Sequence, residues 1–249
     1  MSGALVGRVA LVTGATRGIG HAVALALGGA GAHIIAIGRT QGGLEALDDS
    51  LLALGGERAT LVPMDLMDGG GIDQLGYAVH QRHGRLDILI HAAGLLQGLR
   101  PAAHIPPAVW DRVIATNLTS AFRLIRSLET LLHASDAGRA VFFTAEQATR
   151  PTAFWGSYAA AKAGLEALVR CWADEVETTS AIRALLVDPG AVRTKLRAEA
   201  YPGEDKDALT SPGDIGAMVL DLVQRSDPGQ PIHATRYADW KAEREPDHS

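Results

Sequence analysis

The stretch RVALVTGATRGIG, residues 8–20, places a run of apolar and β-branched residues directly before three glycines. Its first six residues are typical of a buried strand. Gly14, Gly18 and Gly20 follow where the chain must turn into a helix. Glycine allows the tight turn, a close approach of backbone to a phosphate, and close packing of helix on strand. The free N–H groups at the helix start would face that phosphate. The stretch therefore predicts a strand–turn–helix unit with a phosphate site at the turn.

Short apolar runs then alternate with helix-length segments along the rest of the chain. The further predicted strands are His33–Ile37, Ala59–Met64, Leu86–His91, Ala140–Thr144 and Ile182–Val187, with a weak seventh near Pro231–Ala234. The predicted helices are His21–Gly29, Gly43–Leu54, Ile72–His83, Ala108–Leu132, Ser157–Thr178 and Ser211–Arg225. Near-continuous apolar strands between helices predict a doubly wound parallel sheet. We expect an α/β Rossmann fold of about seven strands with helices on both faces.

No composition shift or linker divides the chain, so we expect one domain over residues 1–249. The segment Asp188–Gly213 is rich in Pro, Gly and charge, which favours a mobile loop. The polar tail Glu243–Ser249 is expected to be flexible.

Bulk composition is that of a globular protein with a real core: 47% of the 249 residues are hydrophobic and 20% are charged. A net charge of −5 gives no basic face for nucleic acid. The single cysteine, Cys171, excludes an internal disulfide framework and fits a reducing compartment, hence the cytoplasm. We see neither a signal peptide at the N-terminus nor an apolar run long enough to span a membrane, and we expect no metal ion.

A tyrosine and a lysine stand four residues apart, at Tyr158 and Lys162, on one face of a predicted helix. A free tyrosine has a pKa near 10, and a lysine one turn away favours its phenolate form. With the G-x-x-x-G-x-G spacing of Gly14, Gly18 and Gly20, this pair resembles the short-chain dehydrogenase/reductase family over nearly the whole chain.

The resemblance implies hydride transfer between a nicotinamide cofactor and a carbonyl or alcohol. Tyr158 would be the general acid/base, Lys162 would lower its pKa and hold the nicotinamide ribose, and Asn117 would anchor a water in the proton relay. The cofactor contacts that it implies are Gly14, Thr16, Arg17, Gly18, Ile19, Gly20, Arg39, Asp65, Leu66, His91, Ala93, Gly94, Tyr158, Lys162, Pro189, Gly190, Val192 and Thr194.

One of these positions departs from the family pattern. His91 stands where the family has the first asparagine of an Asn-Asn-Ala-Gly segment. Imidazole can also donate a hydrogen bond, so His91 either replaces that cofactor contact or is a hydrogen-bonded histidine at a strand end.

The choice between NADP and NAD depends on the end of the second strand. An acidic residue there would bind the ribose hydroxyls and repel a 2′-phosphate, but this chain has Gly38 followed by Arg39. Guanidinium matches phosphate in charge and geometry, and Arg17 adds a second positive group. NADP is therefore favoured over NAD, unless Arg39 is only a solvated surface charge.

The anomaly of the chain is Ala145, thirteen residues before Tyr158, where the family has a serine that donates to the substrate oxygen. Removing one such donor costs about 10²–10³ in rate in other enzymes. Three explanations stay open. In the first, a neighbouring residue supplies the donor, namely Thr144, Gln147 or Thr149, although strand alternation points Thr144 away. In the second, tyrosine works alone. In the third, catalysis is lost. Glu146, next in the chain, is expected to face solvent or pair with Arg150.

The loops that set substrate choice in the family carry an apolar set here, namely Leu95, Leu96, Leu99, Phe154, Trp155 and Tyr201. They favour a hydrophobic small-molecule carbonyl or alcohol, or else pack the loops or a subunit contact. Family members usually pair through two long helices, so the resemblance implies a homodimer or homotetramer. The alternative function is a weakly active or inactive NADP-binding protein with a sensing or partner-binding role.

Overall fold

Within the described residues, 3–225 and 235–244, the computed structural model contains one sheet of seven parallel strands. The strands are β1 (Val9–Thr13), β2 (His33–Gly38), β3 (Thr60–Pro63), β4 (Ile88–His91), β5 (Arg139–Phe143), β6 (Arg183–Asp188) and β7 (Thr235–Arg236), in the order β3-β2-β1-β4-β5-β6-β7. The predicted doubly wound sheet is confirmed.

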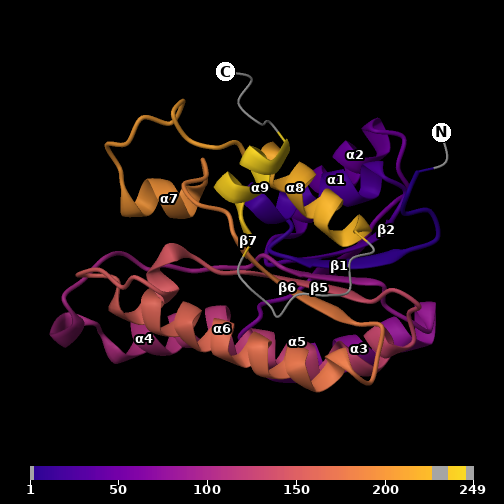
Figure 1. Ribbon diagram of the computed structural model, residues 1–249, viewed down its shortest axis with the longest axis horizontal. Helices are drawn as coiled ribbons and strands as arrows, with labels where there is room; N and C mark the ends of the chain where they lie inside the picture. Colours follow the sequence, from indigo (N-terminus) through magenta and orange to yellow (C-terminus); the bar gives the residue numbers. More distant parts are fainter. Residues whose placement is uncertain (1–2, 226–234, 245–249) are drawn as a thin grey trace.

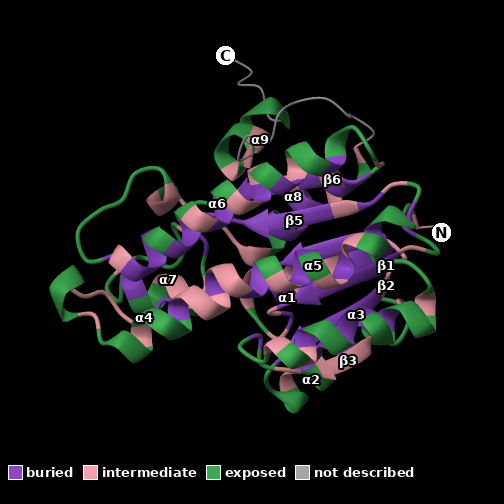
Figure 2. Ribbon diagram, turned by 90° about the horizontal axis from the view of Figure 1, so that it is seen from below, coloured by how far each residue is buried: buried purple, intermediate pink, exposed green. Residues whose placement is uncertain are grey.

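Helices cover both faces of the sheet (Figure 1). One face carries α1 (Gly18–Gly29), α2 (Gln41–Ala53), α8 (Pro212–Gln224) and α9 (Tyr237–Arg244); the other carries α3 (Gly69–His83), α4 (Pro107–Ile114), α5 (Ser120–His133) and α6 (Gly156–Glu177). Two apolar clusters fill the space between sheet and helices, with Leu11 in one and Val12 in the other. Successive strand residues point to opposite faces, so every inner strand is buried on both sides, as the purple strands of Figure 2 show.

The order of the strands creates a crevice at one edge. The chain runs from β1 outward to β3, then returns to place β4 on the other side of β1. At this reversal Thr13, the last residue of β1, pairs with His91, the last residue of β4. Ligands of such sheets bind outside the carboxyl ends of the strands at this point. The fold therefore places the glycine turn that follows Thr13 at the expected binding edge.

Up to residue 225, the helices differ from the predicted set in two places. The long helix expected over Ala108–Leu132 is α4 followed directly by a π-helical segment, Ala115–Thr119, and then by α5. A short helix, α7 (Lys195–Ala200), lies inside the segment expected to be a loop. Thr194 caps it, because its Oγ1 accepts from the Arg197 N–H at 3.2 Å. Six residues are too few to give a helical period in the sequence.

The C-terminal predictions are only partly accessible to comparison. The weak strand expected near Pro231–Ala234 lies outside the described residues, and β7 follows it at Thr235–Arg236. Helix α9, which was not predicted, includes Glu243 and Arg244 of the expected tail, whose remaining residues are also outside the described part.

A buried carboxylate, Asp87, ties together the amino ends of β1 and β4. It accepts hydrogen bonds from the Val9 N–H at 2.8 Å, Ser135 Oγ at 2.7 Å, Arg8 Nη1 at 2.9 Å and Arg85 Nε at 3.2 Å. Burial raises the pKa of Asp87, but these hydrogen bonds, led by that of Ser135, outweigh it and hold the pKa below the ordinary 3.8.

We expect Asp87→Asn to lower the free energy of unfolding by about 2–4 kcal/mol, because it leaves buried donors without their anionic partner. A depressed folded-state pKa gives stability that is complete above the unfolded pKa and is lost as pH falls through the folded pKa. The gap between variant and wild type should therefore be full at neutral pH and shrink in acid. Urea unfolding at a series of pH values measures it. The matched control is Asp136→Asn, whose exposed carboxylate binds the same Arg8 and should matter far less. Equal stabilities of Asp87→Asn and wild type at neutral pH would contradict this account.

Candidate active site

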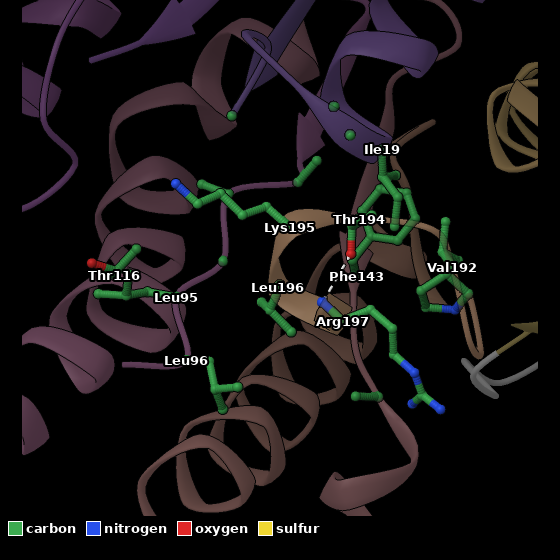
Figure 3. A pocket seen from close by; sticks show the side chains of 18 of the residues that line it. Ile19, Leu95, Leu96, Thr116, Phe143, Val192, Thr194, Lys195, Leu196 and Arg197 are labelled. Atoms are coloured by element: carbon green, nitrogen blue, oxygen red, sulfur yellow. Dashed lines mark hydrogen bonds between the residues drawn. The ribbon is translucent and has the colours of Figure 1, made fainter. Parts of the chain in front are cut away.

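A cavity of about 600 Å³ opens at the carboxyl ends of the strands, between the glycine turn, α6 and α7. Figure 3 shows part of its wall, with Leu95, Leu96 and Thr116 on one side and Thr194 to Arg197 on another. The predicted site residues that line it are Gly14, Thr16, Arg17, Gly18, Ile19, Gly20, Arg39, Asp65, Leu66, Ala93, Gly94, Tyr158, Lys162, Pro189, Gly190, Val192 and Thr194. The fold thus brings together residues from six separate stretches of sequence.

The glycine turn has the geometry that a phosphate site requires. Gly14 and Gly18 have φ of +67° and +58°, a region that glycine favours. A Cβ on Gly14 would lie 3.0 Å from the Ala93 backbone, and one on Gly20 would lie 2.4 Å from Gly14 O, so the turn packs without room for side chains. No side chain caps α1, whereas Ser211 caps α8. The first N–H groups of α1 are therefore left for an anion, and this cradle fits the pyrophosphate of a dinucleotide.

Tyr158 and Lys162 lie side by side in the first turns of α6, both buried. Lys162 Nζ donates to Phe143 O at 2.6 Å and lies 5.7 Å from the centre of the Tyr158 ring. Burial lowers the pKa of Lys162 to about 8. Burial, and next the carboxylate of Asp188, raise the pKa of Tyr158 above its usual range. The sequence predicts the opposite direction for Tyr158. Within the protein alone, desolvation of the phenolate outweighs the attraction of the lysine.

Asn117 lies in the π-helical segment and is fully buried beside the cavity, not in its wall. Its Oδ1 accepts from the Leu95 N–H and its Nδ2 donates to Leu95 O, both at 2.8 Å. The side chain therefore fixes the loop after β4. A π-helical turn shifts the backbone hydrogen-bond pattern locally, as often seen at functional sites. The predicted role of Asn117 in anchoring a water stays a prediction.

His91 is the one predicted cofactor contact that the structure places elsewhere. Its ring is 1% exposed, does not line the cavity, and has both nitrogens within hydrogen-bond distance of protein hydroxyls. Of the two predicted interpretations, the structure favours a hydrogen-bonded histidine at the end of β4 over a direct contact with the cofactor.

The position of the missing serine is apolar. Ala145 packs against the cluster of Leu96, Trp155 and Tyr158. Two of the three proposed substitute donors are used elsewhere: Thr144 Oγ1 donates to Glu166 at 2.6 Å, and the exposed Thr149 donates to Glu146 O at 3.3 Å. Gln147 lines the cavity. Of the three candidates, Gln147 alone has a side chain at the cavity that is not already committed to another group in the described residues.

Glu146 behaves as the sequence predicts. Its carboxylate is 61% exposed and lies 3.8 Å from Arg150 Nη1, four residues along. It therefore faces solvent at the rim.

Aromatic side chains form the wall beside Tyr158. Trp155 packs with its ring centre 5.5 Å from that of Tyr158 and 6.0 Å from that of Tyr201. Leu95, Leu96 and Trp155 of the predicted apolar set line the cavity, while Phe154 is 55% exposed. Sequence reasoning missed the wall residues of α7 and β7, which are Lys195, Leu196, Arg197, Glu199, Ala200 and Arg236. The only signal for the α7 residues was their position in the loop after the sixth strand.

Two other kinds of feature are absent from the described residues. They contain no group of three or more His, Cys, Asp or Glu side chains placed to hold a metal ion. None of the helices in this part of the chain is long and apolar enough to cross a membrane.

Comparison with known proteins agrees with this fold and site. The family model described as short chain dehydrogenase matches residues 8–205, and the chain belongs to that family. It is an NAD(P)-dependent dehydrogenase or reductase. The chain is 34% identical over 218 residues to the uncharacterized oxidoreductase YciK of Escherichia coli K12, covering 87% of this chain and 86% of the relative.

Two solved structures resemble it closely. A short chain dehydrogenase of Shigella flexneri 2a, complexed with NADP, is 32% identical with a TM-score of 0.90, covering 96% of this chain and 100% of that one. A short chain dehydrogenase of Escherichia coli CFT073, complexed with NADPH, is 31% identical with a TM-score of 0.90, covering 95% and 99%.

Proposed function

We propose that this protein is an NADP(H)-dependent oxidoreductase that interconverts a ketone or aldehyde and an alcohol, with Tyr158 as the general acid/base. The observation that carries the proposal is that Tyr158 and Lys162 line the same cavity as the uncapped start of α1. A dinucleotide on the glycine turn and a carbonyl beside Tyr158 would share this one cavity.

The bound cofactor supplies the hydride, and the protein supplies the proton. The phenol of Tyr158, whose pKa lies above its ordinary value near 10, is protonated at neutral pH, so it can donate to the oxygen as negative charge develops there. Lys162 is 4% exposed, and its positive charge favours the phenolate as the proton leaves. Because water is largely excluded around this pair, its electrostatic effect on the tyrosine is stronger than at the surface.

The preference for NADP rests on two arginines at the cavity rim. Arg39 and Arg17 are both exposed there, and within the described residues neither is paired with a carboxylate. A Cβ on Gly38 would lie 2.4 Å from Thr16 Cγ2, so the acidic residue that would repel a 2′-phosphate does not fit without rearrangement. The two solved relatives described above, which are complexed with NADP or NADPH, add support.

We expect Arg39→Ala to weaken NADPH binding about tenfold or more and to leave NADH binding nearly unchanged, because only NADPH carries the phosphate that the guanidinium would bind. Fluorescence titration with each cofactor measures both constants. Arg58→Ala is a matched control, since that arginine is exposed but pairs with Asp48 away from the cavity. Equal losses for the two cofactors would contradict the phosphate assignment.

The test of the whole proposal uses the purified chain. Binding of NADPH, followed by its oxidation on addition of aromatic or aliphatic ketones, is the expected result. Binding without oxidation of NADPH by any member of the ketone panel would favour the alternative, a cofactor-binding protein with a sensing or partner-binding role. Absence of binding would reject both.

The substrate proposed is a hydrophobic carbonyl or alcohol, since Leu95, Leu96 and Trp155 line the cavity next to Tyr158.

A single domain and a homodimer or homotetramer stay predictions. Phe122 supports the assembly proposal, because this aromatic residue is 48% exposed on α5, a helix that is expected to pair. Light scattering would measure the state of association.

A further inference from the structure

A histidine lies at the point where the sheet reverses direction. His91 ends β4 and pairs in register with Thr13, which ends β1, directly before the glycine turn. Its ring is 1% exposed and packs 6.0 Å from that of Phe142. A polar ring buried to this extent must satisfy both nitrogens, or the fold loses stability.

The hydrogen bonds around the ring determine where its proton is. Ser120 Oγ donates its one proton to Thr116 O at 2.7 Å, so it can only accept from His91 Nε2, 3.3 Å away. Nε2 therefore carries the proton and Nδ1 is the acceptor. Thr13 Oγ1, at 3.1 Å from Nδ1, donates to it, and itself accepts from the Ala93 N–H at 3.2 Å. Every donor in this chain of bonds has one acceptor.

Charge on the ring would break this arrangement. A protonated imidazole has two donors and no acceptor, so Nδ1 would face Thr13 Oγ1 without the present bond unless the hydroxyl turned. Burial, and next the charge of Lys162, lower the pKa of His91 to about 3. The ring is thus neutral at neutral pH.

The chain of bonds joins three pieces of the cavity wall. Thr13 directly precedes the glycine turn, Ala93 lines the cavity after β4, and Thr116 belongs to the π-helical segment. The glycine turn and the segment after β4 are in close contact, since a Cβ on Gly14 would lie 3.0 Å from the Ala93 backbone. A change in the bond from Thr13 to His91 would therefore alter the space into which a dinucleotide fits.

We propose that His91 is a positioning residue for the dinucleotide site, which sets the spacing between the glycine turn and the segment after β4 as the neutral tautomer protonated on Nε2. The inference rests on the proposed NADP function. It differs from a direct cofactor contact because no atom of His91 needs to touch the ligand.

The first measurement needs no cofactor. Long-range ¹⁵N–¹H NMR spectra of the labelled protein, with the His91 resonances assigned by their loss in His91→Gln, should show Nε2 protonated and Nδ1 bare at neutral pH. The opposite tautomer, or a charged ring, would overturn the proposal.

The second measurement is NADPH affinity by fluorescence titration, at a temperature where circular dichroism shows each variant fully folded. We expect His91→Leu to weaken binding about tenfold or more, as for the loss of a buried hydrogen bond. His91→Gln, which keeps one acceptor and one donor, should recover most of the loss. A purely structural role would lower the melting temperature without this rescue of affinity. Equal affinity of His91→Leu and wild type would overturn the proposal.

If His91→Leu does not fold, Thr13→Val provides a second variant for the affinity measurement. It preserves side-chain shape and removes the donor to Nδ1, so it should weaken NADPH binding in the same direction. Wild-type affinity in Thr13→Val would count against the proposal. If the wild type does not bind NADPH, both the proposed function and this inference are rejected. If the wild type binds NADPH tightly and the variants bind it equally well, this inference alone is rejected.

Discussion

Replacing Tyr158 by phenylalanine should lower the rate of ketone reduction by about 10²–10⁴, the range in which a positioned general acid contributes. The change removes one oxygen and keeps the ring that packs against Trp155, so the wall of the cavity should stay in place. NADPH affinity should stay within about twofold, because the hydroxyl contributes mainly where charge develops on the substrate. The measurement is kcat and KM for the best ketone of the panel, with the cofactor titrated separately.

Tyr77→Phe is the matched control. Tyr77 is 70% exposed on α3 and does not line the cavity, so the same loss of a hydroxyl there should leave turnover unchanged. If Tyr158→Phe reduces ketones as fast as the wild type, the assignment of Tyr158 as the proton donor is wrong.

The second large effect is a gain. Ala145→Ser should raise kcat by about 10²–10³, the factor that one hydrogen-bond donor to the developing oxyanion contributes. Ala145 has extended backbone, with φ −161° and ψ 157°, which serine adopts without strain. Its side chain borders the cavity, so a hydroxyl there can reach a substrate. Ala148→Ser, three residues on and outside the cavity wall, is the control and should change nothing.

An unchanged rate in Ala145→Ser would leave two explanations, another donor that already acts or a tyrosine that needs none. Gln147 is the candidate that the structure favours, because the hydroxyls of Thr144 and Thr149 donate elsewhere. In that case Gln147→Leu should slow the wild type, and Ala145→Ser should restore the rate in the double variant. If Gln147→Leu has no effect in either background, tyrosine works without a second side-chain donor.

Most of the fold could be predicted because each strand is a local apolar run and each main helix has a local period. The cofactor site could be predicted from the glycine turn, because only glycine leaves room for the close backbone packing seen at Gly14 and Gly20. Helix α7 could not be predicted in this way. Its six residues are held by the Thr194 cap and by Arg197 bonded to Glu204 and stacked on Tyr201, contacts with no period of their own.

The chemistry of single groups was harder to predict than their positions. The sequence places Tyr158 and Lys162 together, but the direction of the tyrosine pKa depends on burial, which only the packed structure shows. His91 likewise looks like a cofactor contact when only the family resemblance of its segment is known. Its actual place depends on Ser120, a residue 29 positions away whose hydroxyl faces the ring.

The pairing of Thr13 with His91 also bears on how the chain is made. These residues are 78 positions apart, yet they lie at the same step of the sheet and border the same crevice. During synthesis β4 emerges well after the glycine turn, because 78 positions separate Thr13 from His91. Because β1 pairs with β2 and β4, a nascent chain that ends before β4 would lack the wall opposite its glycine turn. The two walls of the dinucleotide site are therefore made one after the other, and the site is complete only once β4 has joined β1.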